Sequence, residues 1–253
     1  MAKITQLLFD CDNTLVMSEE LAFEACADIA NEILAKRDIT DRYTGEQLIQ
    51  DFVGQNFRGM MISLQGKYGF EMPKDEIEFY VKEEENQVIA KLEAKAVPCT
   101  GVMEELEKLQ RSGQYDMAVV SSSALRRVRA SIKKVNQDKY FKHDHVFSAA
   151  TSLPKPTSKP DPAIYLYALE KLNKKATECV AIEDSRSGAL SAIRAGIPVI
   201  AYVGSYPGDA KRAEMAGKLI ELGAQVVMKD WSEFESCLKQ IEDQPVERSE
   251  ANL

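Results

Sequence analysis

Short apolar runs and stretches of helical periodicity alternate along most of the chain. The apolar runs have the length of buried strands, and between them apolar residues recur every three or four positions, as in amphipathic helices. Strands that alternate with helices are typical of a doubly wound parallel sheet. We therefore predict an α/β, Rossmann-like core. Its predicted strands are residues 4–9, 115–120, 146–149, 179–182, 198–203 and 225–228.

One long segment breaks this alternation, because residues 17–96 show helical periodicity and no convincing strand. A crossover between parallel strands needs about 30 residues, yet Asp10 and Ser121, at the ends of the first two strands, are 121 − 10 = 111 positions apart. The residues beyond those that a crossover needs predict an inserted all-helical cap, which would lie over the carboxyl edge of the sheet as a lid. The predicted boundaries are 1–16 and 97–243 for the core, 17–96 for the cap and 244–253 for a polar tail.

Capping and helix-breaking residues place the ends of the predicted helices. Ser18 and Thr44 are favourable N-caps. Gly69 and Gly196 end helices, because glycine readily adopts the left-handed conformation found just after a helix. The predicted helices are residues 18–36, 44–52, 60–68, 73–94, 101–109, 124–135, 163–172, 188–195, 210–222 and 231–241.

Composition narrows the class of protein. Of the 253 residues, 45% are hydrophobic, which is enough for a sizeable core. The net charge of −8 argues against nucleic acid as a partner, and no apolar run reaches the roughly 18 residues that a membrane span needs. The chain starts directly with a strand, without a leader of signal type, and contains no CxxC pair. These features predict a cytoplasmic protein with reduced cysteines, at positions 11, 26, 99, 179 and 237.

Two carboxylates directly follow the first predicted strand. Asp10 and Asp12 would lie at the carboxyl edge of the sheet, where open α/β folds bind ligands, and side chains two apart on a strand point to the same side. A polar turn explains the pair almost as well. An EF-hand loop does not, because Leu15 and Leu21 occupy the positions that need Gly and Glu. Two like charges repel, so a cation or a shared proton would account for them.

Other polar clusters end later strands or start helices at the same predicted edge. Each cluster alone has an ordinary explanation, as a turn, a solvated lysine or a helix start. Together they bring carboxylates, hydroxyls and an ammonium to one edge of one sheet, which predicts a site for phosphoryl transfer. The clusters are Ser121 with Ser122, then Lys159, then Glu183 with Asp184.

The residue types suggest what each group would do. Asp10 and Asp184 would bind Mg²⁺, which prefers a few protein oxygens together with waters and phosphate oxygens. The Ser121 hydroxyl, nearby backbone N–H groups and Lys159 would hold a phosphate. Either Asp10 or Asp12 would attack phosphorus, and the other would protonate the leaving oxygen. The position of Asp10 nearer the strand favours it as the nucleophile.

Four segments, in this order and spacing, resemble the motifs of the haloacid dehalogenase-like superfamily. The resemblance covers residues 4–240. The helical insertion is similar to the cap of the branch that contains β-phosphoglucomutase and the sugar-phosphate phosphatases. The matching segments are Phe9–Val16, Val120–Ser122, Lys159–Pro162, and Ile182–Ser185 with Gly188.

The resemblance implies an active site and a cofactor. Asp10 would be the nucleophile, and Asp12 would be the acid and base. The cofactor would be Mg²⁺, bound by Asp10, the main-chain carbonyl of Asp12 and Asp184, with Glu183 in support. The phosphate-binding residues would be Ser121, Ser122 and Lys159.

Three positions qualify the resemblance. Asn13 stands where the first motif usually has glycine, and asparagine tolerates tight turns. Met17 stands where many relatives carry aspartate. The predicted cap loop at residues 54–58 resembles the loop that meets the substrate in the family, which makes Arg58 a candidate for contact with a substrate oxygen or phosphate. An exposed helix arginine is the alternative interpretation of Arg58.

These observations predict a Mg²⁺-dependent phosphatase that hydrolyses a small sugar or polyol phosphate through an aspartyl-phosphate. A phosphosugar mutase of the β-phosphoglucomutase type is the first alternative. A dehalogenase is less favoured, because a halide leaving group needs no proton from Asp12. A phospho-acceptor signalling domain has comparable residues but no inserted cap. A catalytically inactive binding protein is disfavoured, because every position that catalysis needs carries a suitable residue.

Overall fold

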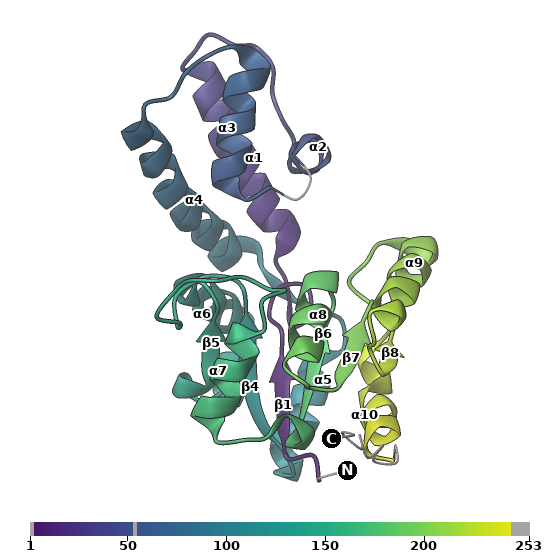
Figure 1. Ribbon diagram of the computed structural model, residues 1–253. Coiled ribbons are helices and arrows are strands. Elements are labelled where there is room, and N and C mark those ends of the chain that lie inside the picture. The colour runs from purple at the N-terminus through teal and green to yellow at the C-terminus, as the bar shows by residue number, and fades with distance from the viewer. Residues whose placement is uncertain (1–2, 53–54, 244–253) are drawn as a thin grey trace, which may run out of the picture. The chain divides into compact units, whose positions relative to one another are not determined.

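Two compact units make up the protein in the computed structural model, which describes residues 3–52 and 55–243 (Figure 1). The α/β unit contains the chain up to Met17 and from Pro98 onward, and the helical unit is Ser18–Val97. The predicted tail at residues 244–253 and Gly54 of the predicted cap loop lie outside the described residues.

The α/β unit is built on a six-stranded sheet in which all paired neighbours run parallel. This arrangement confirms the predicted fold class. Sheets of this kind carry helices on both faces, which explains why their strands read as continuous apolar runs. The spatial order is β5 (Val146–Ser148), β4 (Asp116–Ser121), β1 (Gln6–Phe9), β6 (Cys179–Glu183), β7 (Val199–Tyr202) and β8 (Val226–Met228).

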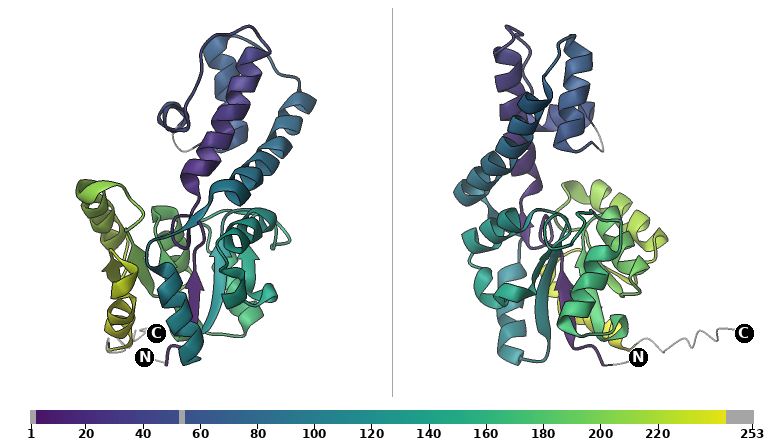
Figure 2. Two further views of the ribbon diagram at one scale, coloured as in Figure 1. Left: turned by 180° about the vertical axis from the view of Figure 1, so that it is seen from behind. Right: turned by 60° about the vertical axis from the view of Figure 1, so that its left-hand side comes forward.

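Helices alternate with these strands along the chain. Figure 2 shows them on both sides of the sheet. They are α5 (Val102–Ser112), α6 (Leu125–Lys134), α7 (Ala163–Leu172), α8 (Arg186–Arg194), α9 (Gly208–Glu221) and α10 (Phe234–Glu242). Four 3₁₀ turns, η1 to η4, are Asp138–Tyr140, His143–His145, Ala176–Glu178 and Trp231–Glu233.

Strand β1 shows how the two faces of the sheet are filled. Leu8 belongs to a buried cluster that includes side chains of α7, α8 and α9. The next residue, Phe9, points to the opposite face, because side chains alternate along a strand. There its ring packs against Phe141, Trp231 and Phe234, with ring centroids 6.0, 6.1 and 6.3 Å away. Burial on both faces fixes the central strand firmly.

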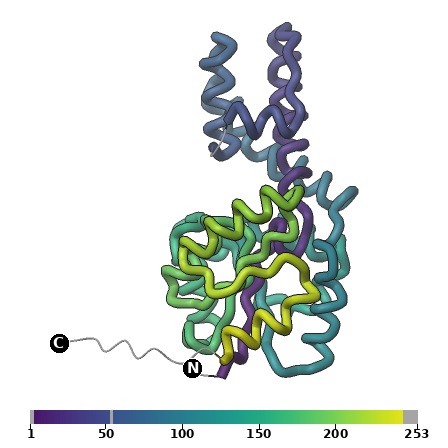
Figure 3. Tube along the Cα trace, turned by 90° about the vertical axis from the view of Figure 1, so that its right-hand side faces the viewer, coloured from purple at the N-terminus to yellow at the C-terminus, as the bar shows by residue number. Residues whose placement is uncertain are grey.

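The winding of the chain reverses beside β1. Strand β1 lies between β4 and β6, and Figure 3 shows its purple trace running through the middle of the unit. From β1 the chain goes to β4 and β5 on one side, whereas from β6 it goes to β7 and β8 on the other. Ligands of doubly wound proteins bind where the winding reverses in this way, beyond the carboxyl ends of the strands. Asp10 and Asp184 are the residues that directly follow β1 and β6.

The helical unit packs four helices around its own apolar cluster. Helix α2 begins with a capping box, in which Thr44 Oγ1 accepts from the Gln47 N–H (3.2 Å) and the Gln47 side chain accepts from the Thr44 N–H (2.9 Å). Gly69 ends α3 in the left-handed conformation, with φ = 70°. The helices are α1 (Glu19–Ala35), α2 (Gly45–Asp51), α3 (Phe57–Tyr68) and α4 (Lys74–Lys95).

All predicted strands and helices are present, with shifted ends. Helix α3 starts at Phe57 instead of residue 60, because Asn56 Oδ1 accepts from the Gly59 N–H (2.9 Å) and caps the helix. The predicted helix at 231–241 begins as the turn η4. Two short strands that are not among the predicted elements, β2 (Val16–Met17) and β3 (Val97–Pro98), form a separate sheet. Within the described residues, no helix combines the length and apolar character that crossing a membrane requires.

Candidate active site

Asp10 lies directly after β1, where this strand pairs with β6. Its main-chain N–H donates to Ile182 O (3.0 Å), so the pairing continues one residue beyond the strand. This contact holds the Asp10 side chain next to the end of β6. Only 7% of the residue is exposed.

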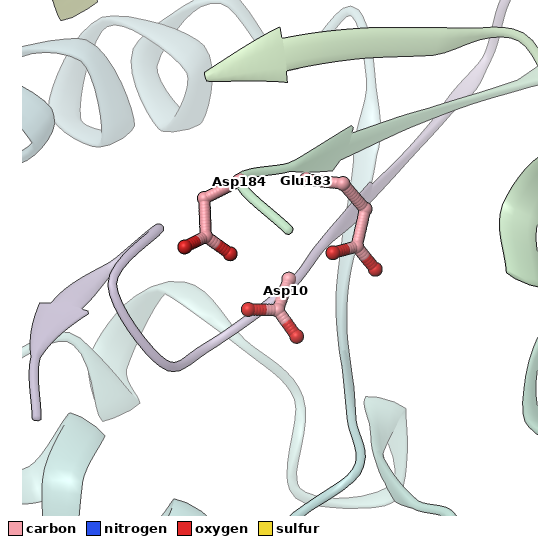
Figure 4. Close-up of side chains that lie close together, drawn as sticks. All are labelled: Asp10, Glu183 and Asp184. Carbon is pink, nitrogen blue, oxygen red and sulfur yellow. The ribbon is translucent and has the colours of Figure 1, made fainter. Parts of the chain in front are cut away.

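Three buried carboxyl groups gather at this point. Asp10, Glu183 and Asp184 each offer an oxygen within 4.8 Å of the other two, and Figure 4 shows the three side chains together where two strands end. Burying like charges this close is unfavourable unless positive charge compensates them. A set of ligands made only of oxygen suits a hard cation such as Mg²⁺.

Lys159 supplies part of the compensating charge. Its ammonium donates to Asp10 Oδ1 and Glu183 Oε1, both at 2.6 Å, and to Val120 O at 2.8 Å. The Lys159 side chain is 3% exposed. Burial by itself would lower the Lys159 pKa, but the two carboxylates outweigh burial and raise it, so the group stays charged.

One lysine faces three buried carboxyl groups, and the Asp10 carboxylate is the one most affected. Burial raises the pKa of Asp10 to about 8; Lys159 opposes the rise, whereas Glu183 and Asp12 add to it. Burial and the acidic neighbours thus disfavour the carboxylate form of Asp10, and positive charge beyond that of Lys159 would stabilise it. A divalent cation bound among these oxygens would supply the balance.

Glu183 is fixed in place by several neighbours. Besides the bond from Lys159, its Oε1 accepts from the Tyr165 hydroxyl at 2.5 Å. Its Oε2 lies so close to Gly188 that a Cβ at this position would be 1.8 Å away, and Oε2 has no hydrogen-bond partner among the described residues. Only glycine fits at this point of α8. The carboxylate thus has one anchored oxygen and one that can accept a further contact.

Asp12 faces different partners from Asp10. Its Oδ2 accepts from the hydroxyls of Ser123 (2.7 Å) and Ser121 (3.4 Å), and Arg127 Nη2 lies 3.4 Å from Oδ1. The expectation that alternation along a strand would point Asp10 and Asp12 to the same side does not apply, because β1 ends at Phe9. Asp10 instead continues the pairing with β6, whereas Asp12 forms an isolated bridge with Val16.

Asn13 makes this turn possible. It adopts φ = 57°, a left-handed conformation that asparagine tolerates, and its N–H donates to Val16 O (2.7 Å). The asparagine at this motif position is therefore compatible with the local backbone, as the sequence predicts.

The two predicted phosphate-binding serines make different contacts. Ser121 is fully buried at the end of β4, and its Oγ accepts from the Ser123 N–H at 3.0 Å. The Ser122 hydroxyl accepts from the Lys159 N–H at 3.2 Å, so it anchors the segment that carries the lysine. Both lie at the edge expected from the sequence, and their binding of phosphate stays a prediction.

Four further side chains belong to the site and are absent from the predicted set. Ser123 and Arg127 contact Asp12, Tyr165 contacts Glu183, and Thr14 Oγ1 donates to Asp184 Oδ1 at 3.5 Å. Ser123 had a local signal, since it closes the serine run. No local sequence signal marks Tyr165 or Arg127 as a site residue. Tyr165 lies in an apolar predicted helix, and Arg127 lies in a basic one.

Arg58 forms an ion pair inside the helical unit. Its guanidinium donates to both carboxylate oxygens of Glu78, at 2.5 and 2.8 Å. About half of each side chain remains exposed. Contact of Arg58 with substrate stays a prediction.

Comparison with known proteins identifies the family of the chain. Residues 7–202 match the family model of the haloacid dehalogenase-like hydrolases. The matched residues include Asp10, Ser121 and Glu183. The chain belongs to this family.

Several relatives within the family are similar over most of their length. The phosphorylated carbohydrates phosphatase of Thermotoga maritima is 33% identical over 93% of this chain and 98% of its own. The 6-phosphogluconate phosphatase of Escherichia coli is 27% identical over 80% of this chain and 84% of its own. A solved structure described as a putative β-phosphoglucomutase from Thermotoga maritima is 26% identical, with a TM-score of 0.71, and covers 94% of this chain and 99% of that one.

Proposed function

We propose that the protein is a Mg²⁺-dependent phosphatase that hydrolyses small sugar or polyol phosphates. The observation that carries this proposal is the buried group of Asp10, Glu183 and Asp184 around Lys159, at the carboxyl ends of β1 and β6. Folding gives no reason to bury three carboxylates together, because replacing such groups by apolar ones is often neutral or stabilising. A chemical function does give a reason.

The residues at the cluster fit a magnesium ion. Asp10 and Asp184 would bind it through carboxylate oxygens, and the main-chain carbonyl of Asp12 would be the third protein ligand. The oxygen-only donor set and the presence of three carboxyl groups around one ammonium support this assignment. Bound there, the ion would neutralise charge on the phosphate oxygens.

The proposed reaction proceeds through a covalent phosphoenzyme. An Asp10 oxygen attacks phosphorus and the ester P–O bond breaks, while Asp12 gives its proton to the leaving oxygen. Asp12 then takes a proton from water, and this water attacks the phosphorus of the aspartyl-phosphate. Inorganic phosphate leaves and Asp10 is regenerated as a carboxylate.

The remaining polar groups position these two carboxylates and the phosphate. Lys159 would hold a phosphate oxygen while it stays bonded to Glu183, and the hydroxyls of Ser121 and Ser122 would contribute further donors. Ser123 holds Oδ2 of Asp12 (2.7 Å) and so limits the orientations of the proposed acid. Pre-positioned groups of this kind lower the entropic cost of reaching the transition state.

The names of the relatives support a phosphorylated carbohydrate as substrate, since two similar proteins are phosphatases for such compounds. The similarity to a putative β-phosphoglucomutase makes a phosphosugar mutase the second candidate. Formation of a hexose 6-phosphate from the 1-phosphate, followed by ³¹P NMR, separates this candidate from net phosphate release.

We also propose a reducing, cytoplasmic environment. All five cysteines lie in the described part of the chain, where they are buried and form no disulfide. Disulfides are rare in reducing compartments.

Phosphate release from a panel of phosphomonoesters, measured with malachite green, tests the proposal. The wild type should turn over in Mg²⁺, stop in EDTA and recover when Mg²⁺ is restored. Asp10→Asn should lower kcat by at least about 10⁴-fold, as for loss of a nucleophile. Asp209→Asn is a matched control, because the Asp209 side chain is fully exposed. Retained turnover in Asp10→Asn, or turnover unaffected by EDTA, would contradict the proposal.

A further inference from the structure

Arg127 is a second cation at the active site, and local helix stability does not explain it. It lies in the first turn of α6, which begins at Leu125 and contains no acidic residue in that turn. The N-terminus of a helix carries partial positive charge, so a cation in the first turn is unfavourable. The Arg127 side chain is 20% exposed, and its Nη2 lies 3.4 Å from Asp12 Oδ1.

The other side of Asp12 is already occupied. Its Oδ2 accepts from the Ser123 and Ser121 hydroxyls. The guanidinium of Arg127 therefore lies beside Oδ1, on a different side of the carboxylate from these two serines. Because Asp12 is the proposed acid, the leaving oxygen must come within a hydrogen bond of its carboxyl group, about 2.7 Å.

These distances place the guanidinium alongside the leaving group. Its Nη2 would lie within roughly 6 Å of the leaving oxygen, which is the sum of the 3.4 Å contact and one hydrogen bond of about 2.7 Å. A substituent a few bonds away from that oxygen would come within reach. Lys159 is not placed for this task, since its ammonium is buried among Asp10, Glu183 and Val120 O.

We propose that Arg127 is a specificity residue that favours phosphomonoesters whose leaving group carries a carboxylate, such as sugar-acid phosphates. The planar guanidinium matches a carboxylate in two parallel hydrogen bonds. A carboxylate carries one negative charge, as Arg127 carries one positive charge. A second phosphate would bring a further negative charge into a site that already holds four carboxyl groups. The inference rests on the proposed phosphatase function and adds the substrate class.

A matched pair of substrates isolates the carboxylate. Gluconate 6-phosphate and glucitol 6-phosphate are both acyclic and differ only in the group formed by the first carbon, which is a carboxylate in one and a hydroxymethyl group in the other. The kcat and KM of the wild type for both substrates would be measured in Mg²⁺. The wild type should prefer gluconate 6-phosphate by about 10-fold or more in kcat/KM, as for loss of one charged hydrogen-bonded contact.

Variants of Arg127 test whether this residue causes the preference. Arg127→Gln should reduce the ratio of the two kcat/KM values by about 10-fold or more, chiefly through a higher KM for gluconate 6-phosphate. Arg127→Lys, which keeps the charge without the planar fork, should retain part of the ratio. Arg126→Gln removes the same charge from the neighbouring, exposed position on α6 and should leave the ratio unchanged.

Other results would overturn the inference in distinguishable ways. Equal kcat/KM of the wild type for the two substrates, or an equal loss for both in Arg127→Gln, would limit Arg127 to orienting Asp12 and would leave the phosphatase proposal intact. Failure of the wild type to release phosphate from any ester would refute the proposed function itself, and the inference with it. Trp231 fluorescence in urea verifies that each variant is folded.

Discussion

Two sets of ion pairs, one in each unit of the protein, lie in opposite environments. In the α/β unit, Lys159 is 3% exposed, and it bonds Asp10 and Glu183, whose side chains are 9% and 0% exposed. In the helical unit, the side chains of Lys67 and Asp51 are 46% and 42% exposed in a pair of similar length, 2.7 Å. Nearly the same contact distance therefore occurs with very different access to water.

The difference shows where charge has a chemical purpose. Exposed pairs are screened by water and contribute little to stability. Buried charges cost several kcal/mol each to remove from water, and their attraction repays this only when the geometry is good. The Lys67–Asp51 pair of the helical unit stays hydrated, so its charges carry little desolvation free energy. The α/β unit buries the charges of Lys159, Asp10 and Glu183 despite their desolvation free energy. At this place the proposed chemistry needs strong electrostatic interactions.

Substitution of the two lysines gives the largest expected contrast in stability. Lys159→Met leaves Asp10 and Glu183 buried without their cation, and it should lower the free energy of unfolding by about 3–5 kcal/mol. Lys67→Met should leave the urea midpoint nearly unchanged, because its partner stays hydrated. The single tryptophan, Trp231, is buried in the α/β unit, so its fluorescence in urea reports the first change. Far-UV circular dichroism follows the second.

Equal shifts of the two midpoints would contradict the comparison. So would a Lys159→Met protein as stable as the wild type, since the buried carboxylates would then not depend on the lysine.

Two glycines give an intermediate contrast. In Gly188→Ala the new methyl group would overlap the Glu183 carboxylate, so the variant should lose about 1–3 kcal/mol and show weaker activation by Mg²⁺. Gly66 lies within α3 with no atom within 4 Å of an added Cβ. Gly66→Ala should therefore gain about 0.5–1 kcal/mol from better helix propensity. Urea unfolding and a Mg²⁺ titration of activity measure both effects.

A stable Gly188→Ala protein with unchanged Mg²⁺ activation would show that Glu183 can move without consequence. This result would weaken the view of Glu183 as a support for the metal site.

Two tyrosine hydroxyls give the smallest contrast. Tyr165→Phe removes the donor to buried Glu183 and should cost about 1–2 kcal/mol, because a buried acceptor loses a partner. Tyr68→Phe removes a hydroxyl that donates to the exposed Asp41 at 2.9 Å, and water replaces this contact. The difference between their urea midpoints is the measured quantity, and a larger loss in Tyr68→Phe would reverse the comparison.

The fold was largely predictable because its signals are local. Apolar runs, caps such as Thr44 and breakers such as Gly69 act within a few residues, and the structure contains the predicted strands and helices. The ends were less predictable. Asn56 extends α3 by starting it at Phe57, and the last predicted helix begins as a 3₁₀ turn. Such ends depend on single hydrogen bonds that no periodicity reveals.

The candidate site was predictable only in part. Asp10, Lys159, Glu183 and Asp184 could be proposed because each ends a strand or precedes a helix at one edge. The contact of Arg127 with Asp12 joins positions 115 residues apart. The sequence pattern predicts the basic helix but not which way the Arg127 side chain points. Residues near Arg127 in the sequence therefore could not identify Asp12 as its partner.

By itself, the sequence determined the alternation of strands and helices, the long helical interruption and the carboxylates that follow β1 and β6. These properties follow from hydrophobic periodicity and from backbone preferences such as that of Asn13, which act over short distances. Only the tertiary structure decided that β6 lies beside β1, which brings Asp10, Glu183 and Asp184 within reach of one ion and buries Lys159 among them. Strand order depends on packing between segments far apart in the chain. It brings the polar residues at the ends of different strands together in one charged site.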